Sequence, residues 1–190
     1  MTAGNAMTPA TPARTGVWIG IATITMSFAA YTSAMVVRQG SGSDWQSITL
    51  PPILYINTLL LLASSGSFAM GRQRLRAGWA GASGAGGRGW LQLTLLLGLL
   101  FIGGQLLAWR ALAAQGLYLA TTPNSGFFYV LTALHALHLL GGVAALLYLL
   151  VRIRRAAATP PLGVLGAVEL YWHFMDVLWL YLLLVLALRL

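Results

Sequence analysis

Five long apolar runs, separated by short polar segments, dominate the 190-residue sequence. Each is about as long as the ~20 residues that an α-helix needs to cross the hydrocarbon core of a bilayer. None shows the strict alternation of barrel strands, and lipid leaves no water for unpaired backbone groups. We therefore predict an all-α membrane protein, a bundle of five transmembrane helices at about 16–37, 51–71, 90–110, 125–151 and 163–188.

The composition agrees with a membrane protein, because only 7% of the residues are charged and 58% are hydrophobic. Soluble domains carry roughly 25% charged residues. The net charge of +8 could suggest a nucleic-acid partner, but the basic residues lie in short loops between apolar runs. That pattern sets membrane topology, so we expect no nucleic-acid binding. The absence of cysteine excludes disulfides and thiolate chemistry.

All eleven basic residues are arginines, and their distribution between the loops predicts the orientation of the chain. The positive-inside rule places the arginine-rich side in the cytoplasm. It therefore predicts a cytoplasmic N-terminus and an outer C-terminus in the cell inner (plasma) membrane. The arginine-rich side has eight residues, Arg14, Arg72, Arg74, Arg76, Arg88, Arg152, Arg154 and Arg155, and the other side has Arg38, Arg110 and Arg189.

Two segments of the cytoplasmic side are predicted to lack fixed structure. Residues 1–15 are rich in Thr, Ala and Pro and are expected to form a disordered tail, so the transmembrane domain spans 16–190. Residues 77–89 are rich in glycine and are expected to form a flexible linker.

The last apolar run holds two of the three acidic residues of the chain. At about 100° per residue, Glu169, His173 and Asp176 fall within a ~60° stripe of one helix. His135 and His138 likewise share one face of the fourth helix. Because an ionisable group facing lipid costs several kcal/mol, we expect all five to face inward and to meet one another.

Three interpretations of this polar cluster remain open. It could be a hydrogen-bonded connection that locks the fourth and fifth helices together. It could handle protons, because buried acids and histidines in membranes often mark proton or ion paths. It could also bind a metal ion, since five such residues supply enough ligands, although the Glu-x-x-His pairs of di-iron bundles are missing.

Other polar residues within the runs have simpler predicted roles. Asn57, Gln105 and Tyr171 are expected to hydrogen-bond to neighbouring helices. The sequence contains no nucleophile–base pattern, phosphate-binding loop or zincin motif. A haem would need two opposed axial histidines, whereas His135 and His138 lie on one face of one helix. We therefore expect no catalytic centre within this chain.

Three stretches resemble a known family, subunit III of the haem–copper oxidases. ELYWHFMDVLWLYLL (169–183) is similar to its C-terminal helix, in which Glu, a short spacer, Tyr-Trp-His-Phe and Asp follow one another. TALHALHLLGG (132–142) resembles the preceding helix with its paired histidines, and LPPILYINTLLLLASSGSF (50–68) resembles an earlier one. The first helix resembles the family only in its Gly-x-Trp opening, and the third only in hydropathy. The resemblance implies a compact five-helix form.

The resemblance also implies roles for individual residues. In the family, the matching residues form buried polar contacts between helices and no metal site, which favours the first interpretation. The residues that match are His135, His138, Glu169, Trp172, His173 and Asp176, with Tyr171 beside them. The family usually has a carboxylate in its first matching helix, where this chain has Ile24.

A non-catalytic subunit III is the function that the resemblance implies. It would support subunit I, beside subunit II, in a terminal oxidase that passes electrons from cytochrome c or quinol to oxygen and translocates protons. Haem and copper would lie in the partner subunits, and this chain would bind no cofactor beyond phospholipid. Two alternatives are a nitric-oxide-reductase-associated homologue and a standalone proton or ion transporter that uses Glu169, His173 and Asp176.

Overall fold

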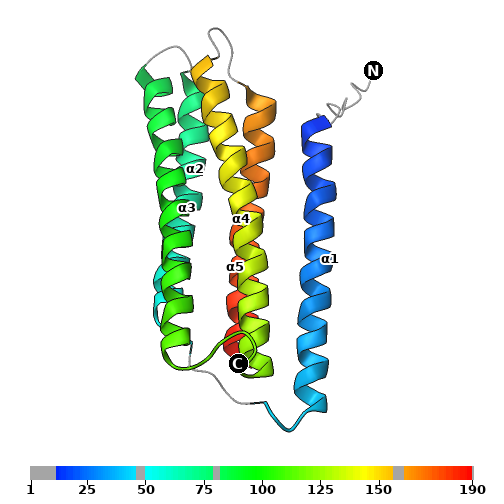
Figure 1. The fold of residues 1–190 in the computed structure, drawn as a ribbon. Coiled ribbons are helices and arrows are strands. Elements are labelled where there is room, and N and C mark those ends of the chain that lie inside the picture. Colours follow the sequence, from blue (N-terminus) through cyan, green and yellow to red (C-terminus); the bar gives the residue numbers. More distant parts are fainter. Residues whose placement is uncertain (1–11, 46–49, 79–81, 156–160, 190) are drawn as a thin grey trace, which may run out of the picture.

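The computed structural model describes residues 12–45, 50–78, 82–155 and 161–189. These ranges contain five α-helices and no strand (Figure 1). Each helix is long and apolar enough to cross a membrane, which confirms the predicted all-α, five-helix fold. The helices are α1 (Pro12–Ser41), α2 (Ile53–Ala77), α3 (Ala82–Ala114), α4 (Pro123–Arg155) and α5 (Leu162–Arg189).

Helices α1 and α3 begin four and eight residues before their predicted starts, while α4 and α5 begin within two residues of theirs. Helix α1 begins at Pro12, so residues 12–15 are helical although they were expected in the disordered tail; residues 1–11 lie outside the described part. Proline suits the first turn of a helix, because its missing N–H would have no partner there. Helix α3 begins at Ala82, within the predicted flexible linker 77–89, of which residues 79–81 are not described.

The glycines of this segment permit close packing of α2 against α3. A Cβ atom at Gly87 would lie 2.7 Å from Leu75 Cγ and 3.0 Å from the carbonyl oxygen of Gly71. Small residues allow the backbones of membrane helices to approach closely, and the packing gained replaces a hydrophobic driving force. The prediction of a flexible linker is therefore wrong for residues 82–89.

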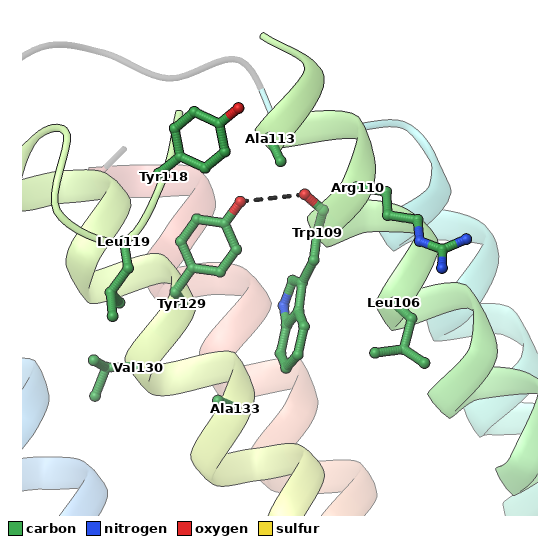
Figure 2. Close-up of a pocket in the computed structure, with 9 residues that line it drawn as sticks. All are labelled: Leu106, Trp109, Arg110, Ala113, Tyr118, Leu119, Tyr129, Val130 and Ala133. Atoms are coloured by element: carbon green, nitrogen blue, oxygen red, sulfur yellow. Dashed lines mark hydrogen bonds between the residues drawn. The ribbon is translucent and has the colours of Figure 1, made fainter. Parts of the chain in front are cut away.

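Helix α5 lies between α2, α4 and α1, while α3 packs mainly on α2 (Figure 1). Trp172 and Trp179 of α5 are fully buried in this core. The ring of Trp179 meets Phe101 of α3 edge-on, with 4.9 Å between centroids. At one end of the bundle, the Tyr129 hydroxyl of α4 donates to the carbonyl of Trp109 in α3 (Figure 2).

Helix α1 is the least buried of the five and lies at the edge of the bundle (Figure 1). Only 17% of the most apolar stretch of α1 is buried, against 39% of the corresponding stretch in each of the other helices. Its buried line consists of Ile21, Ile24, Phe28 and Met35, so Ile24 faces the bundle. The remaining faces of α1 are available to lipid or to another protein.

Candidate functional site

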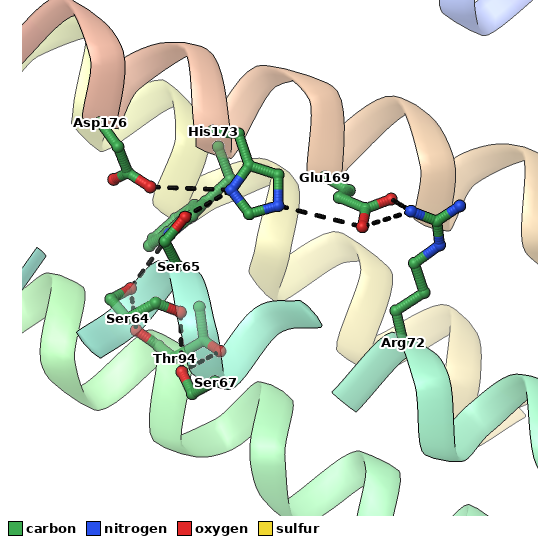
Figure 3. A network of polar contacts seen from close by, with 9 residues as sticks. Ser64, Ser65, Ser67, Arg72, Thr94, Glu169, His173 and Asp176 are labelled. Carbon is green, nitrogen blue, oxygen red and sulfur yellow. Dashed lines mark hydrogen bonds and ion pairs between the residues drawn. The ribbon is translucent and has the colours of Figure 1, made fainter. Parts of the chain in front are cut away.

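The acidic stripe of α5 faces α2, at the end of the bundle where α2 finishes and α5 begins. Both carboxylate oxygens of Glu169 lie 2.5 Å from Nη1 of Arg72 (Figure 3). The Glu169 side chain is 10% exposed and that of Arg72 is 33% exposed. Charge-assisted bonds of this kind are shorter and roughly twice as strong as neutral ones. This ion pair therefore joins two helices that are distant in sequence.

His173 continues the polar cluster away from that end of the bundle. Its Nε2 lies 3.9 Å from Glu169 Oε1, and its Nδ1 lies 3.8 Å from Asp176 Oδ2 (Figure 3). Nδ1 also hydrogen-bonds to the hydroxyl of Ser65 on α2. The spacing on one helical face places the imidazole between the two acids, and the Ser65 contact ties it to a neighbouring helix, although the His173 side chain is 39% exposed and not fully turned inward.

A group of hydroxyls extends the same contact to α3. Trp172 donates from Nε1 to Ser64 Oγ at 3.0 Å, and Ser64 Oγ lies 3.4 Å from the carbonyl oxygen of Thr94. The hydroxyls of Ser67 and Thr94 are 2.7 Å apart (Figure 3). Three helices are therefore joined by polar contacts in one region. We refer below to Ser65, Arg72, Glu169, His173 and Asp176 as the α2–α5 cluster.

The two histidines of α4 do not join this cluster. His135 is fully buried between aromatic rings, 5.1 Å from the centroid of Trp179 and 5.9 Å from that of Phe101. Neither of its nitrogens has a hydrogen-bond partner among the described residues. His138 bonds through Nδ1 to the carbonyl of Leu134 on its own helix, at 2.7 Å.

The expected meeting of the α4 histidines with the acids is therefore wrong, for two geometric reasons. The acidic stripe points to α2, whereas α4 packs on a different face of α5. His135 also lies beside Trp179, which is ten residues beyond Glu169 and thus about 15 Å along the helix. Trp179 is less than one turn from Asp176, so the difference in face alone separates His135 from that acid. Helix α4 is connected to α5 by Tyr171, whose hydroxyl donates to the carbonyl of His138 at 2.9 Å, as predicted.

The two amides for which interhelical hydrogen bonds were predicted, Asn57 and Gln105, differ from that expectation. Within the described ranges, the Gln105 side chain is buried and has no hydrogen-bond partner, so its predicted interhelical bond is wrong. Asn57 Nδ2 is also without a partner there. The Asn57 side chain instead packs directly against the backbone of α3 at Gly104. The two are so close that a Cβ atom at position 104 would collide with the Asn57 side chain.

The partner that the sequence did not reveal is Arg72. It was counted among the residues that set topology, because it directly follows the predicted end of the second run. The predicted topology could have indicated this partner. Because α2 ends and α5 begins on the same side of the membrane, Arg72 and Glu169 lie at similar depths. A charged residue one turn from a helix end is a natural counter-ion for a buried acid at the same depth.

The chemistry that these residues can perform follows from their arrangement. In the described part of the chain, no three His, Asp or Glu residues are grouped so that they could hold a metal ion. The groups pair in a line between helices and do not converge on a common point. The fold and this cluster together define a multi-pass membrane protein whose polar side chains connect its helices.

Comparison with known proteins places this membrane protein in a family. The sequence model described as cytochrome c oxidase subunit III matches residues 17–188, which is nearly the whole bundle. The probable cytochrome c oxidase subunit 3 of Mycobacterium tuberculosis (strain H37Rv) is 34% identical over 161 residues, covering 80% of this chain and 74% of the relative. The chain belongs to the cytochrome c oxidase subunit III family and is part of an oxidase complex.

Two further relatives carry the same name. Cytochrome c oxidase subunit 3 of Corynebacterium diphtheriae is 31% identical over 158 residues, with 80% of this chain and 74% of the relative covered. That of Synechocystis sp. (strain PCC 6803) is 31% identical over 173 residues, with 90% and 68% covered. The resemblance seen in the C-terminal motif is thereby confirmed over most of the chain.

Proposed function

We propose that this chain is a non-catalytic subunit III that supports subunit I, beside subunit II, in the inner (plasma) membrane. The complex passes electrons from cytochrome c to oxygen and translocates protons, with haem and copper held by its partners. The names of the relatives support the oxidase, and the placement of the histidines supports the absence of a catalytic centre. His135 is enclosed by aromatic rings, and His138 bonds to its own helix.

The orientation proposed for the chain is an N-terminus in the cytoplasm and a C-terminus outside. The arginine distribution supports it. Arg14, the C-terminal turns of α2 and α4, and the start of α3 gather eight of the eleven arginines at one end of the bundle (Figure 1). This end would face the cytoplasm. A cysteine introduced at Arg154 would then be blocked only by reagents that cross the membrane.

The main structural support for this proposed role is the ion pair between Arg72 and Glu169. It joins α2 to α5 across 97 residues of sequence and is extended by the contacts of His173. Groups that bond in pairs between helices hold those helices in register. We therefore propose that the α2–α5 cluster keeps the bundle in the shape that its partner subunits recognise.

One observation favours a second candidate function for this cluster, proton handling. A cavity of about 590 Å³ opens beside it and is lined by Arg14, Arg76, Glu169 and His173 among others. The His173 side chain is 39% exposed and borders this cavity. Asp176 is buried beyond His173 and is the last ionisable residue in the row that starts at Glu169.

The oxidase assignment is tested by purifying the tagged chain in a mild detergent. A reduced-minus-oxidised visible spectrum and mass spectrometry of the preparation are then recorded. We expect haem absorption and a large many-helix partner, because a subunit without its own haem acquires colour only from its complex. A colourless and homogeneous preparation would contradict the proposal and direct attention to proton flux in liposomes, as expected of a standalone transporter.

The two roles of the cluster are separated by Glu169→Gln. A structural role predicts that less of this chain stays with the complex, while each intact complex takes up protons normally. A proton role predicts normal assembly with reduced proton uptake. Oxygen consumption compared with nitric oxide reduction by the same preparation distinguishes the oxidase from a nitric-oxide-reductase-associated homologue.

A further inference from the structure

The cavity of about 590 Å³ at the arginine-rich end of the bundle has a polar lining drawn from three helices. Arg14 comes from α1, Arg72 and Arg76 come from α2, and the remaining wall is the beginning of α5. Among the described residues, α1 packs on α4 and α5 but not on α2, so the cavity separates α1 from α2 at this end. Its volume is within the range of about 300–1,000 Å³ that is typical of small-molecule sites.

The walls of this cavity carry more positive than negative charge. Three arginines line it, and Glu169 is the single carboxylate among the described lining residues. Glu169 is paired with Arg72 (Figure 3), and the other two acids of the chain contact other residues. Among the described residues, Arg14 and Arg76 therefore form no salt bridge, and their guanidinium groups are available to an anion from outside the chain.

The first turns of α5 add the positive end of a helix to the same wall. Gly163 and Gly166 line the cavity, and a Cβ atom at Gly166 would meet nothing within 4 Å. The first turn of α5 contains no acidic residue. Because the N-terminal end of a helix carries partial positive charge and free N–H donors, it favours an anion. The helix end thus adds to the attraction that the two arginines exert.

The lining favours a water-soluble anion over a phospholipid. Of the described residues around the cavity, only Leu162 and Leu170 have large apolar side chains, so it lacks a long apolar wall for an acyl chain. Arg14 and Arg76 are exposed and lie in terminal turns of their helices, where an aqueous ligand can reach them. The planar guanidinium group matches phosphate oxygens in a bidentate manner. Two such groups on different helices can each hold one phosphate.

We propose that this cavity binds a soluble anion with two linked phosphate groups, the chemistry shared by inorganic pyrophosphate and nucleoside diphosphates. One phosphate contacts Arg14 and the other contacts Arg76, with the first turn of α5 beside them. Arg72 stays paired with Glu169 and keeps its role between helices. Since the site is formed by residues of this chain, the proposal does not depend on the electron donor or on the catalytic partners.

The test is equilibrium dialysis of radiolabelled pyrophosphate against the detergent-purified protein, together with the subunits that co-purify. We expect saturable binding, which Arg14→Gln and Arg76→Gln should each weaken about tenfold, the lower end of what a hydrogen bond to a charged group supplies. Both arginines are exposed, so these variants should keep the fold. The matched control Arg154→Gln removes an exposed arginine of the same end that does not line the cavity, and it should retain wild-type binding.

A second variant should change the affinity in the opposite direction. Glu169→Gln removes the negative charge from the lining, so pyrophosphate should bind more tightly, which a purely structural contact would not produce. Unlabelled succinate, with two carboxylates in place of phosphates, should displace the label only at much higher concentration than unlabelled pyrophosphate.

Three results would overturn the proposal. The first is unchanged pyrophosphate binding in both Arg14→Gln and Arg76→Gln. The second is equal weakening in Arg154→Gln, which would indicate a diffuse attraction to the whole arginine-rich end. The third is displacement by succinate as effective as displacement by pyrophosphate. Loss of a co-purified phospholipid from the two arginine variants, with pyrophosphate binding unchanged, would instead assign the cavity to a lipid headgroup and equally refute the proposal.

Discussion

The contact between Arg72 and Glu169 permits a quantitative prediction. The perturbation is Glu169→Gln, which keeps an oxygen that can accept from Arg72 but removes the negative charge. Both carboxylate oxygens lie 2.5 Å from Arg72 Nη1, so the guanidinium loses a full charge partner at close range. The single variant Arg72→Gln and the double variant complete a cycle that isolates the pair.

The exposure of the two side chains sets the magnitude. Exposed pairs contribute about 0.2–1 kcal/mol, whereas breaking a fully buried pair costs about 3–5 kcal/mol. Glu169 is 10% exposed and Arg72 is 33% exposed, so the pair lies between these limits. We expect each single variant to lower the free energy of unfolding by about 2 kcal/mol. The double variant should lose about 2 kcal/mol as well, because no unpaired charge remains, which gives a coupling energy of about 2 kcal/mol.

The assay is reversible unfolding of the purified chain in mixed micelles of increasing denaturing detergent, with loss of helical circular dichroism as the readout. The control is Arg154→Gln, which removes an exposed arginine from the same end of the bundle. It should cost less than about 0.5 kcal/mol, as surface substitutions usually do. A double variant that loses the sum of the two single losses would refute the reasoning, because the side chains would then act independently.

The remaining predictions concern packing, a buried histidine and a surface ion pair. Gly87→Ala should cost about 1–3 kcal/mol because its Cβ would overlap Leu75, whereas Gly89→Ala, in open space, should cost nothing; thermal denaturation compares them. His135→Phe should be neutral or stabilising in the same assay, since it removes two unpaired buried nitrogens, and a loss of proton uptake would contradict that view. The Arg38 guanidinium donates to Asp44 at 2.7 Å and holds the pKa of that carboxyl below its usual value. The Arg38–Asp44 contact stabilises the folded chain fully at pH values above the ordinary Asp pKa of about 3.9. This stabilisation is lost as the pH falls through the lowered pKa of Asp44. Arg38→Gln should raise the pKa of Asp44 in an NMR titration, and an unchanged value would argue against the pair.

Hydropathy was sufficient to predict the number of helices but not their ends. Apolar runs stop where arginines begin, whereas backbone hydrogen bonding continues into the interfacial region. Helix α2 therefore extends beyond the predicted residue 71 to Ala77. Helix α3 likewise begins at Ala82, because the glycines there permit contact with α2. Composition alone could not distinguish glycine that loosens a chain from glycine that lets two backbones meet.

For the site, helical periodicity predicted which side chains share a face but not which helix that face meets. Glu169, His173 and Asp176 do lie together, as their spacing requires. Their contacts with Arg72 and Ser65 depend on the order of helices around the bundle, which a single sequence does not encode locally. The same limit placed His135 with the acids, although the structure surrounds it with aromatic rings.

The sequence distance between Arg72 and Glu169 has a consequence for biogenesis. Helices enter the membrane in chain order, so α2 is inserted long before the ribosome has made α5, 97 residues later. Helices α2 and α3 can already pack through Gly71 and Gly87, but the positive charge at the end of α2 has no acidic partner until α5 arrives. The contact between α2 and α5 can therefore form only after Glu169 has been synthesised, and until then Arg72 is without its acidic partner.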